Sequence, residues 1–191
     1  MLINFIKRNK IFSFIILITI FTFIGGIIIH SLLDISTKGE IVNNLYNYSN
    51  NINIKNIFDD LFSNILLFII IWLFGISVVG IPIIIFLYLF KVLISSLEIV
   101  FLILNIKTVG VIFSLISIVF ILLNLILLFL LFYYACNYSV CLIKVLFLKY
   151  NYNIKLITKR FIKILLFCFI GIIVVYLLKY IVFIKILVLL K

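Results

Sequence analysis

This sequence has little charge, one proline and one histidine, and few residues of the kinds that most often perform catalysis. Among its 191 residues, 11% are charged and only five are acidic, whereas 68% are hydrophobic. A soluble domain of this size lacks the polar surface to cover so many apolar side chains. The composition therefore predicts an integral membrane protein of the all-α class, because long apolar runs cross a bilayer as helices.

The sequence also lacks the motifs of common enzyme classes. It contains no HExxH, GxSxG or P-loop motif and no carboxylate pair inside an apolar run. Asp59 and Asp60 precede an apolar run, where we interpret them as helix-capping residues. The cysteines Cys136, Cys141 and Cys168 form no CxxC motif and lie in or beside apolar segments, which favours a packing role. We predict a protein that is not an enzyme and uses no metal or cofactor.

The net charge of +11 indicates sidedness rather than nucleic-acid binding. Basic residues of membrane proteins concentrate on the cytoplasmic side. The basic N-terminus and the acid-free basic stretch 136–163 are therefore expected inside, and the stretch 31–60, which holds four of the five acids, is expected outside. This arrangement requires the long apolar run 61–106 to cross the membrane twice.

The charge pattern thus predicts one membrane domain, residues 1–191, which forms a five-helix bundle in the cell membrane with a cytoplasmic N-terminus. The expected crossings are residues 11–30, 61–80, 81–106, 111–135 and 164–184, with an outer loop at 31–60 and a cytoplasmic basic loop at 136–163. The first crossing has no small-residue cleavage site, so we expect it to be retained.

The apolar run 61–106 is interrupted at Gly80 and Pro82. Proline cannot donate a backbone N–H and disfavours helix in the residue before it, and glycine permits unusual backbone angles. Proline in the first turn of the next helix leaves no helical hydrogen bond missing. These residues predict a tight helical hairpin near the cytoplasmic face, with a kinked or re-entrant helix as the alternative. Gly75 and Gly80 also predict close packing of the second helix.

Lys91, Ser95 and Glu98 are spaced i, i+4 and i+7, which places them on one face of the third helix. Ionisable residues inside a membrane segment are candidates for function. This polar stripe could contact another helix, a partner or an ion path. Alternatively, Lys91 reaches toward the interface and forms a structural pair with Glu98.

The basic stretch 154–163 is amphipathic, with Lys155, Lys159 and Lys163 four residues apart. It could lie on anionic lipid, although its cations could equally serve only to fix the topology. The outer stretch 31–60 is too small for a domain of its own, but it could dock a partner outside the cytoplasm.

The segment Ile71-Trp72-Leu73-Phe74-Gly75-Ile76-Ser77-Val78-Val79-Gly80-Ile81-Pro82-Ile83-Ile84, followed by Lys91, resembles stage II sporulation protein M of endospore-forming bacteria. The tryptophan, the two glycines, the Gly-Ile-Pro sequence and the lysine carry the resemblance. The five apolar segments and the early outer stretch agree with that family.

The resemblance implies a non-enzymatic scaffold that acts in engulfment of the forespore. In that family the protein assembles with stage II sporulation proteins D and P, which remodel peptidoglycan, in the membrane that engulfs the forespore. The structural or partner residues suggested for this chain are Trp72, Gly75, Gly80, Pro82, Lys91, Ser95 and Glu98. The alternative is a small permease or transporter subunit that uses Lys91 and Glu98 within the membrane.

Overall fold

The computed structural model describes residues 10–50, 54–77, 79–148 and 153–189. Within these ranges the chain is helical apart from short turns and contains no strand. The helices are α2 (Lys10–Leu32), α3 (Ile35–Asn50), α4 (Ile54–Gly75), α5 (Ile81–Leu104), α6 (Ile106–Val109), α7 (Val111–Leu148) and α8 (Ile154–Leu189). Five of them, α2, α4, α5, α7 and α8, are long and apolar enough to cross a membrane, which confirms the predicted all-α bundle.

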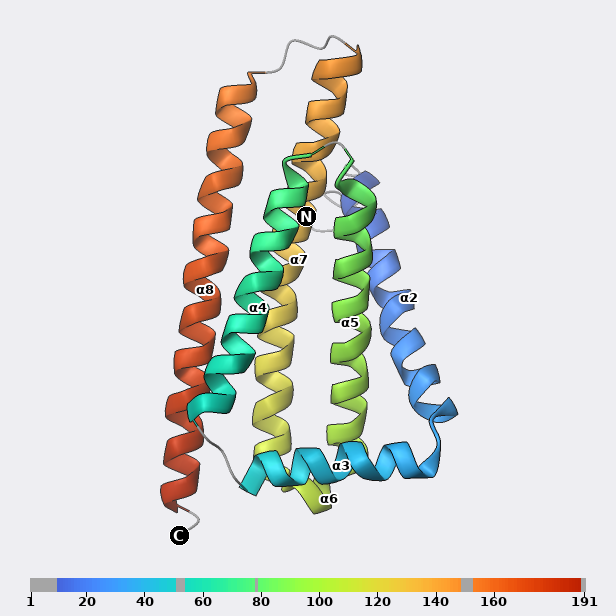
Figure 1. Ribbon diagram of the computed structural model, residues 1–191, viewed down its shortest axis with the longest axis vertical. Coiled ribbons are helices and arrows are strands. Elements are labelled where there is room, and N and C mark those ends of the chain that lie inside the picture. Colours follow the sequence, from blue (N-terminus) through green and yellow to red (C-terminus); the bar gives the residue numbers. More distant parts are fainter. Residues whose placement is uncertain (1–9, 51–53, 78, 149–152, 190–191) are drawn as a thin grey trace.

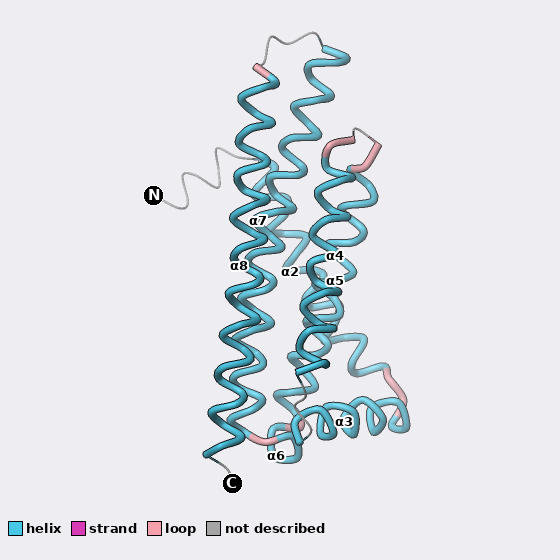
Figure 2. Tube along the Cα trace, turned by 60° about the vertical axis from the view of Figure 1, so that its left-hand side comes forward, coloured by secondary structure: helices cyan, strands magenta, loops and turns pink. Residues whose placement is uncertain are grey.

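The five long helices run up and down beside one another, whereas α3 lies across one end of the bundle (Figure 1). The short helix α6 lies at the same end, and Figure 2 shows both from a second direction. We call this the α3 end. The turn between α4 and α5 lies at the opposite end, which we call the hairpin end.

The outer surface of the bundle is apolar on every long helix. On α2, for example, the exposed large side chains are Phe14, Leu17, Ile20, Phe21, Ile24, Ile27 and Ile28. Water would not stabilise such a surface, but lipid tails would. Exposed apolar residues here are therefore what a multi-pass membrane protein requires.

The turn between α4 and α5 confirms that the apolar run 61–106 forms two helices. Helix α4 ends at Gly75, five residues before the predicted boundary, and α5 begins at Ile81 with Pro82 in its first turn. Gly80 is the N-cap, and its carbonyl accepts a hydrogen bond from the Ile84 N–H at 2.9 Å. A Cβ at Gly80 would overlap the backbone carbonyl of Phe74, so this turn requires glycine.

The end of α4 is held closely against α7. A Cβ at Gly75 would lie 2.9 Å from the Ala135 Cβ, so the two backbones can approach only because position 75 is glycine. The Ser139 hydroxyl donates a hydrogen bond of 2.6 Å to the Gly75 carbonyl. This bond satisfies one of the carbonyls that a helix leaves without an intrahelical partner at its C-terminus.

Aromatic and small side chains fill the middle of the bundle. Tyr88 on α5 stacks on Phe132 of α7, with ring centroids 4.1 Å apart, and its hydroxyl lies 2.8 Å from the Thr19 hydroxyl on α2. Gly26 of α2 faces Ser96 of α5 so closely that a Cβ would overlap the serine hydroxyl. Close helix contacts of this kind stabilise bundles in membranes, where lipid competes for apolar contacts.

The segment predicted as an outer loop, 31–60, is mostly helical. Residues Ile35–Asn50 form α3, and α4 begins at Ile54, well before the predicted start at residue 61. Ile41, Leu45 and Tyr48 recur at helical spacing and face the bundle, so this segment is amphipathic. Its many polar residues led to the prediction of a loop.

The segment predicted as a cytoplasmic basic loop, 136–163, is also mostly helical. Helix α7 continues to Leu148, and α8 begins at Ile154, so both helices are longer than the predicted crossings. Tyr138 stacks on Phe161 at 4.8 Å and shares a hydrogen bond of 2.9 Å with Thr158, which joins the two extensions. The amphipathic stretch 154–163 is thus the start of α8 and not a separate surface helix; its contact with anionic lipid stays a prediction.

Candidate functional site

A polar cavity of about 360 Å³ lies between the helices toward the α3 end. Helices α3, α4, α5, α7 and α8 all contribute to its wall. The polar and charged residues that line it are Asn44, Tyr48, Asp60, Asn64, Lys91, Ser95, Glu98, Ser117, Asn124, Tyr176 and Lys179. A volume of this size equals that of roughly a dozen liquid waters. The cavity is the main polar feature of the described part of the bundle interior.

Lys91, Ser95 and Glu98 all line this cavity, as their shared helical face predicts. The Glu98 side chain is exposed, Lys91 is half-buried and Ser95 is buried. Because all three face the same cavity, Glu98 owes its exposure to a hollow within the protein. The stripe therefore points into the bundle instead of toward lipid, as expected for intramembrane charges.

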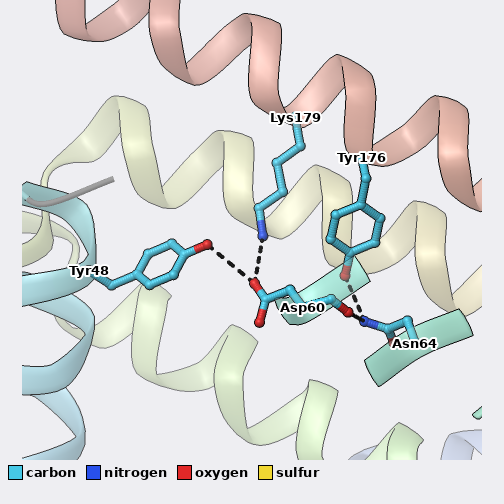
Figure 3. A network of polar contacts seen from close by, with 5 residues as sticks. All are labelled: Tyr48, Asp60, Asn64, Tyr176 and Lys179. Atoms are coloured by element: carbon cyan, nitrogen blue, oxygen red, sulfur yellow. Dashed lines mark hydrogen bonds and ion pairs between the residues drawn. The ribbon is translucent and has the colours of Figure 1, made fainter. Parts of the chain in front are cut away.

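Asp60 on α4 is the centre of a polar network at the α3 end (Figure 3). Its Oδ2 atom accepts a hydrogen bond of 3.2 Å from the Tyr48 hydroxyl and lies 3.4 Å from Lys179 Nζ. These contacts join the consecutive helices α3 and α4 to α8, which is far from both in the sequence. The Lys179 ammonium also lies 5.7 Å from the Tyr48 ring centroid and 5.5 Å from the Tyr176 ring centroid.

The network continues one helical turn further along α4. The Asn64 amide nitrogen donates hydrogen bonds to the Asp60 backbone carbonyl at 2.8 Å and to the Tyr176 hydroxyl at 2.6 Å. Asn124 on α7 also lines the cavity, and its Oδ1 atom is buried with no hydrogen-bond partner among the described residues. A buried acceptor without a partner costs about 1–3 kcal/mol, so water or a ligand is needed there.

Helical spacing explains how the sequence assembles this wall. Asp60 and Asn64 are four residues apart on α4, and Tyr176 and Lys179 are three apart on α8, so each pair lies on one helix face. On α3, Ile41, Asn44, Leu45 and Tyr48 follow the same pattern and turn one side of that helix toward the cavity. Helices α4 and α8 therefore each present a short polar stripe in a largely apolar sequence, whereas α3 presents a mixed face of apolar and polar residues.

The cavity contains two cations and two carboxylates. Lys91 and Lys179 oppose Asp60 and Glu98, so their formal charges cancel. Burial raises the pKa of the Tyr48 hydroxyl above its usual value of 10, and the negative charge of Asp60 raises it further. Tyr48 therefore stays protonated and can donate to Asp60 at physiological pH. Together these groups can hold a polar solute by hydrogen bonds and charge.

The other residues predicted from sequence lie away from this cavity. Trp72, Gly75, Gly80 and Pro82 belong to the hairpin end and its approach along α4. Trp72 packs against the core, and its buried Nε1 atom has no hydrogen-bond partner among the described residues. These four residues build the fold, whereas Lys91, Ser95 and Glu98 take part in the cavity.

Several cavity residues were not predicted as site residues from the sequence. Asp60 was predicted as a helix cap, but α4 begins six residues earlier and the carboxylate pairs with Lys179 instead. Lys179 and Asn124 carried a usable signal, because Lys179 is the only charged residue in the apolar run 164–184 and Asn124 is the only amide side chain in the run 111–135. Tyr176 had no such signal, since tyrosine is common near membrane interfaces.

No protein-family model matches this chain, and comparisons with characterised protein sequences and with solved structures found no similar protein. The likeness to stage II sporulation protein M therefore depends on the sequence segment 71–91 alone. In the structure that segment includes the end of α4, the hairpin turn and the start of α5.

Proposed function

We propose that this protein is a non-enzymatic membrane scaffold that anchors peptidoglycan-remodelling proteins during forespore engulfment in a spore-forming bacterium. The observation that carries the proposal is α3, a helix outside the five long helices that is fixed to one end of the bundle. Such a helix offers a partner protein a preformed surface at the membrane boundary.

The two faces of α3 differ in the way that a docking helix requires. Tyr48 and Leu45 face the bundle, and Tyr48 is bonded to Asp60 there. Glu40, Asn43 and Asn47 are exposed. One face thus fixes the helix to the membrane domain while the other leaves polar groups free of the bundle.

The sequence resemblance supports the identity of the partners. Its glycines and proline form the hairpin between α4 and α5, and Gly75 packs closely against α7. By this resemblance the partners are stage II sporulation proteins D and P. The protein would lie in the engulfing mother-cell membrane with α3 between the two membranes.

The test is performed in the spore-forming source organism. We expect deletion of the gene to stall engulfment and to scatter fluorescently tagged D and P proteins. Replacing Glu40 and Asn43 by lysine on the exposed face of α3 should weaken co-purification of those proteins while the membrane level of the chain stays normal. The matched control is Lys107→Gln on α6, which is exposed at the same end. Normal engulfment in the deletion strain would refute the scaffold.

A second function, that of a small permease, is supported by the charged cavity between the helices. Transporters place ionisable residues and polar sites near the middle of the membrane. Replacing Lys91 and Glu98 together by leucine separates the two functions. A permease would lose transport in vesicles, whereas a scaffold would still bind its partners.

A further inference from the structure

Two of the four charged groups that line the cavity form no hydrogen bond or ion pair with another described side chain. Asp60 bonds to Tyr48 and lies beside Lys179, so that pair is satisfied. Lys91 and Glu98 each line the cavity, yet neither forms a hydrogen bond or an ion pair with another described side chain. An ammonium and a carboxylate therefore face the same hollow without direct contact to an opposite charge.

Their positions on α5 separate these two charges along the cavity. Glu98 follows Lys91 by seven positions, which corresponds to about 10 Å along the helix axis. Glu98 is nearer the α3 end, and Lys91 is deeper in the bundle. Lys91 is thus the cation at the deep end of the cavity, whereas Glu98 lies toward α3, where the Asp60–Lys179 pair also lies. Ser95 lies between Lys91 and Glu98 on the same helix face.

The charge balance limits what can fill this space. Lys91 and Lys179 equal Asp60 and Glu98 in number, so a simple anion or cation would leave a net charge among low-dielectric helices. A neutral apolar molecule would leave Lys91, Glu98 and the unpartnered Asn124 Oδ1 unsatisfied. A molecule with both charges satisfies the two ends at once and keeps the charge of the cavity balanced.

The spacing also indicates the length of that molecule. An extended peptide spans about 3.3–3.6 Å per residue, so about three residues match the distance between Lys91 and Glu98. The cavity volume of about 360 Å³ falls within the range of small-molecule sites. A short peptide with free termini would place its carboxylate at Lys91 and its ammonium at Glu98.

We propose that the cavity binds a zwitterion, with the anionic group at Lys91 and the cationic group at Glu98. The two possible sources are a free solute such as a short peptide and the ethanolamine phosphate headgroup of a lipid. Binding requires neither transport nor a partner protein, so it stands or falls separately from both functions proposed above.

The test uses the purified full chain in an uncharged maltoside detergent. Binding of trialanine, glycerophosphoethanolamine and lysophosphatidylethanolamine is measured by the shift in thermal unfolding and by calorimetry. N-acetyl-trialanine amide, which has the same three residues as trialanine but no terminal charges, is the uncharged probe. We expect one of the zwitterions to bind and the uncharged probe to fail.

Comparison of the probes identifies the source of the ligand. Binding of trialanine points to a free solute, whereas binding of only the two ethanolamine probes points to a lipid headgroup. Equal binding of the uncharged probe, or binding of none of the probes, would overturn the proposal, because the cavity would then hold apolar groups or water alone.

Variants assign the binding to the two charges. Lys91→Met and Glu98→Gln keep the size of the side chains, and each should weaken affinity at least tenfold. Lys107→Met and Glu40→Gln, which are exposed outside the cavity, should leave it unchanged. The melting curve without ligand shows in the same experiment whether each variant is folded. Unchanged affinity in both folded cavity variants would refute the assignment.

Discussion

The hairpin end and the α3 end of the bundle differ in how their helices meet. At the hairpin end, Gly75 and Gly80 bring backbones into contact, and Ser139 joins two helices through one short hydrogen bond. At the α3 end, the helices diverge around a polar cavity and contact one another through charged and aromatic side chains. At the hairpin end the helices meet because glycines have no side chains, whereas at the α3 end they meet through long side chains.

The residues that stabilise the fold and the residues that line the polar cavity therefore lie at different ends of the bundle. The glycines and proline of the family-like segment are needed where space is smallest, so their identity follows from packing. The charged groups lie where space remains, so their identity follows from what occupies that space. The sequence motif of this chain therefore lies at the closely packed hairpin end, while the polar cavity lies toward the α3 end.

Substitution of Gly80 should have the largest effect and tests whether the hairpin end depends on glycine. A side chain at position 80 would meet the Phe74 backbone, which cannot move aside easily. We expect Gly80→Val to lower the free energy of unfolding by about 3 kcal/mol or more, as in strongly overpacked sites. The measurement is unfolding by sodium dodecyl sulfate in mixed micelles.

Gly25→Ala is the control for that experiment. No atom lies within 4 Å of a Cβ at position 25, and alanine favours helix over glycine. Its effect should stay within about 1 kcal/mol. Equal stability of the Gly80→Val protein and the wild type would show that the turn tolerates side chains.

Loss of the Ser139 hydroxyl should have the next largest effect. Ser139→Ala leaves the Gly75 carbonyl without its buried donor, so we expect a loss of about 1–3 kcal/mol in unfolding free energy. Ser31→Ala removes a bond of equal length at an exposed site and should cost at most about 0.5 kcal/mol. If both variants lost the same stability, the two ends would not differ in the way described.

Removal of the Lys179 charge tests the α3 end. Lys179 is 15% exposed and Asp60 is 46% exposed, so water moderates the cost of leaving Asp60 unpaired. We expect Lys179→Met to cost about 1 kcal/mol, with most of it recovered when Asp60→Asn is added. A double-mutant cycle measures this coupling, with Lys107→Met as the exposed control. Strict additivity of the two changes would contradict the pairing.

Tyr48 should give the smallest effect at neutral pH. Tyr48→Phe removes one hydrogen bond to a half-exposed carboxylate, so the expected loss at pH 7 is below about 1 kcal/mol. The pKa of Tyr48 is raised in the folded state by burial and by Asp60, so above pH 10 the unfolded chain releases a proton that the folded chain keeps. Stability therefore falls as pH rises past 10, and it should fall less in Tyr48→Phe. Unfolding free energies measured at pH 8 and 10.5 check this, and identical slopes would contradict it.

The features that depend on local sequence were predictable. Long apolar runs gave the five crossings, Pro82 gave the turn between α4 and α5, and the i, i+4, i+7 spacing placed Lys91, Ser95 and Glu98 on one face. Each conclusion needs only backbone geometry and the cost of polar groups in lipid. Which side of the membrane holds the N-terminus stays a prediction from charge alone.

The features that depend on distant contacts were not predictable. Asp60 and Lys179 are 119 residues apart, and no pattern in one sequence links them. The helical state of the predicted loops depends on partners as well, because α3 is fixed through Tyr48 and the extensions of α7 and α8 through Tyr138 and Phe161. Tertiary packing stabilises these segments as helices, although their polar composition predicts loops.

The distance in sequence between Asp60 and Lys179 has a consequence for biogenesis. Chains are made from the N-terminus, so α4 and α5 leave the ribosome while α8 is still unsynthesised. Asp60, Lys91 and Glu98 therefore enter the bilayer before the only cation that contacts Asp60 among the described residues exists. The Asp60–Lys179 pair therefore forms only after α8 has been made, and a chain that stops short of residue 179 should be an unassembled substrate for quality-control proteases.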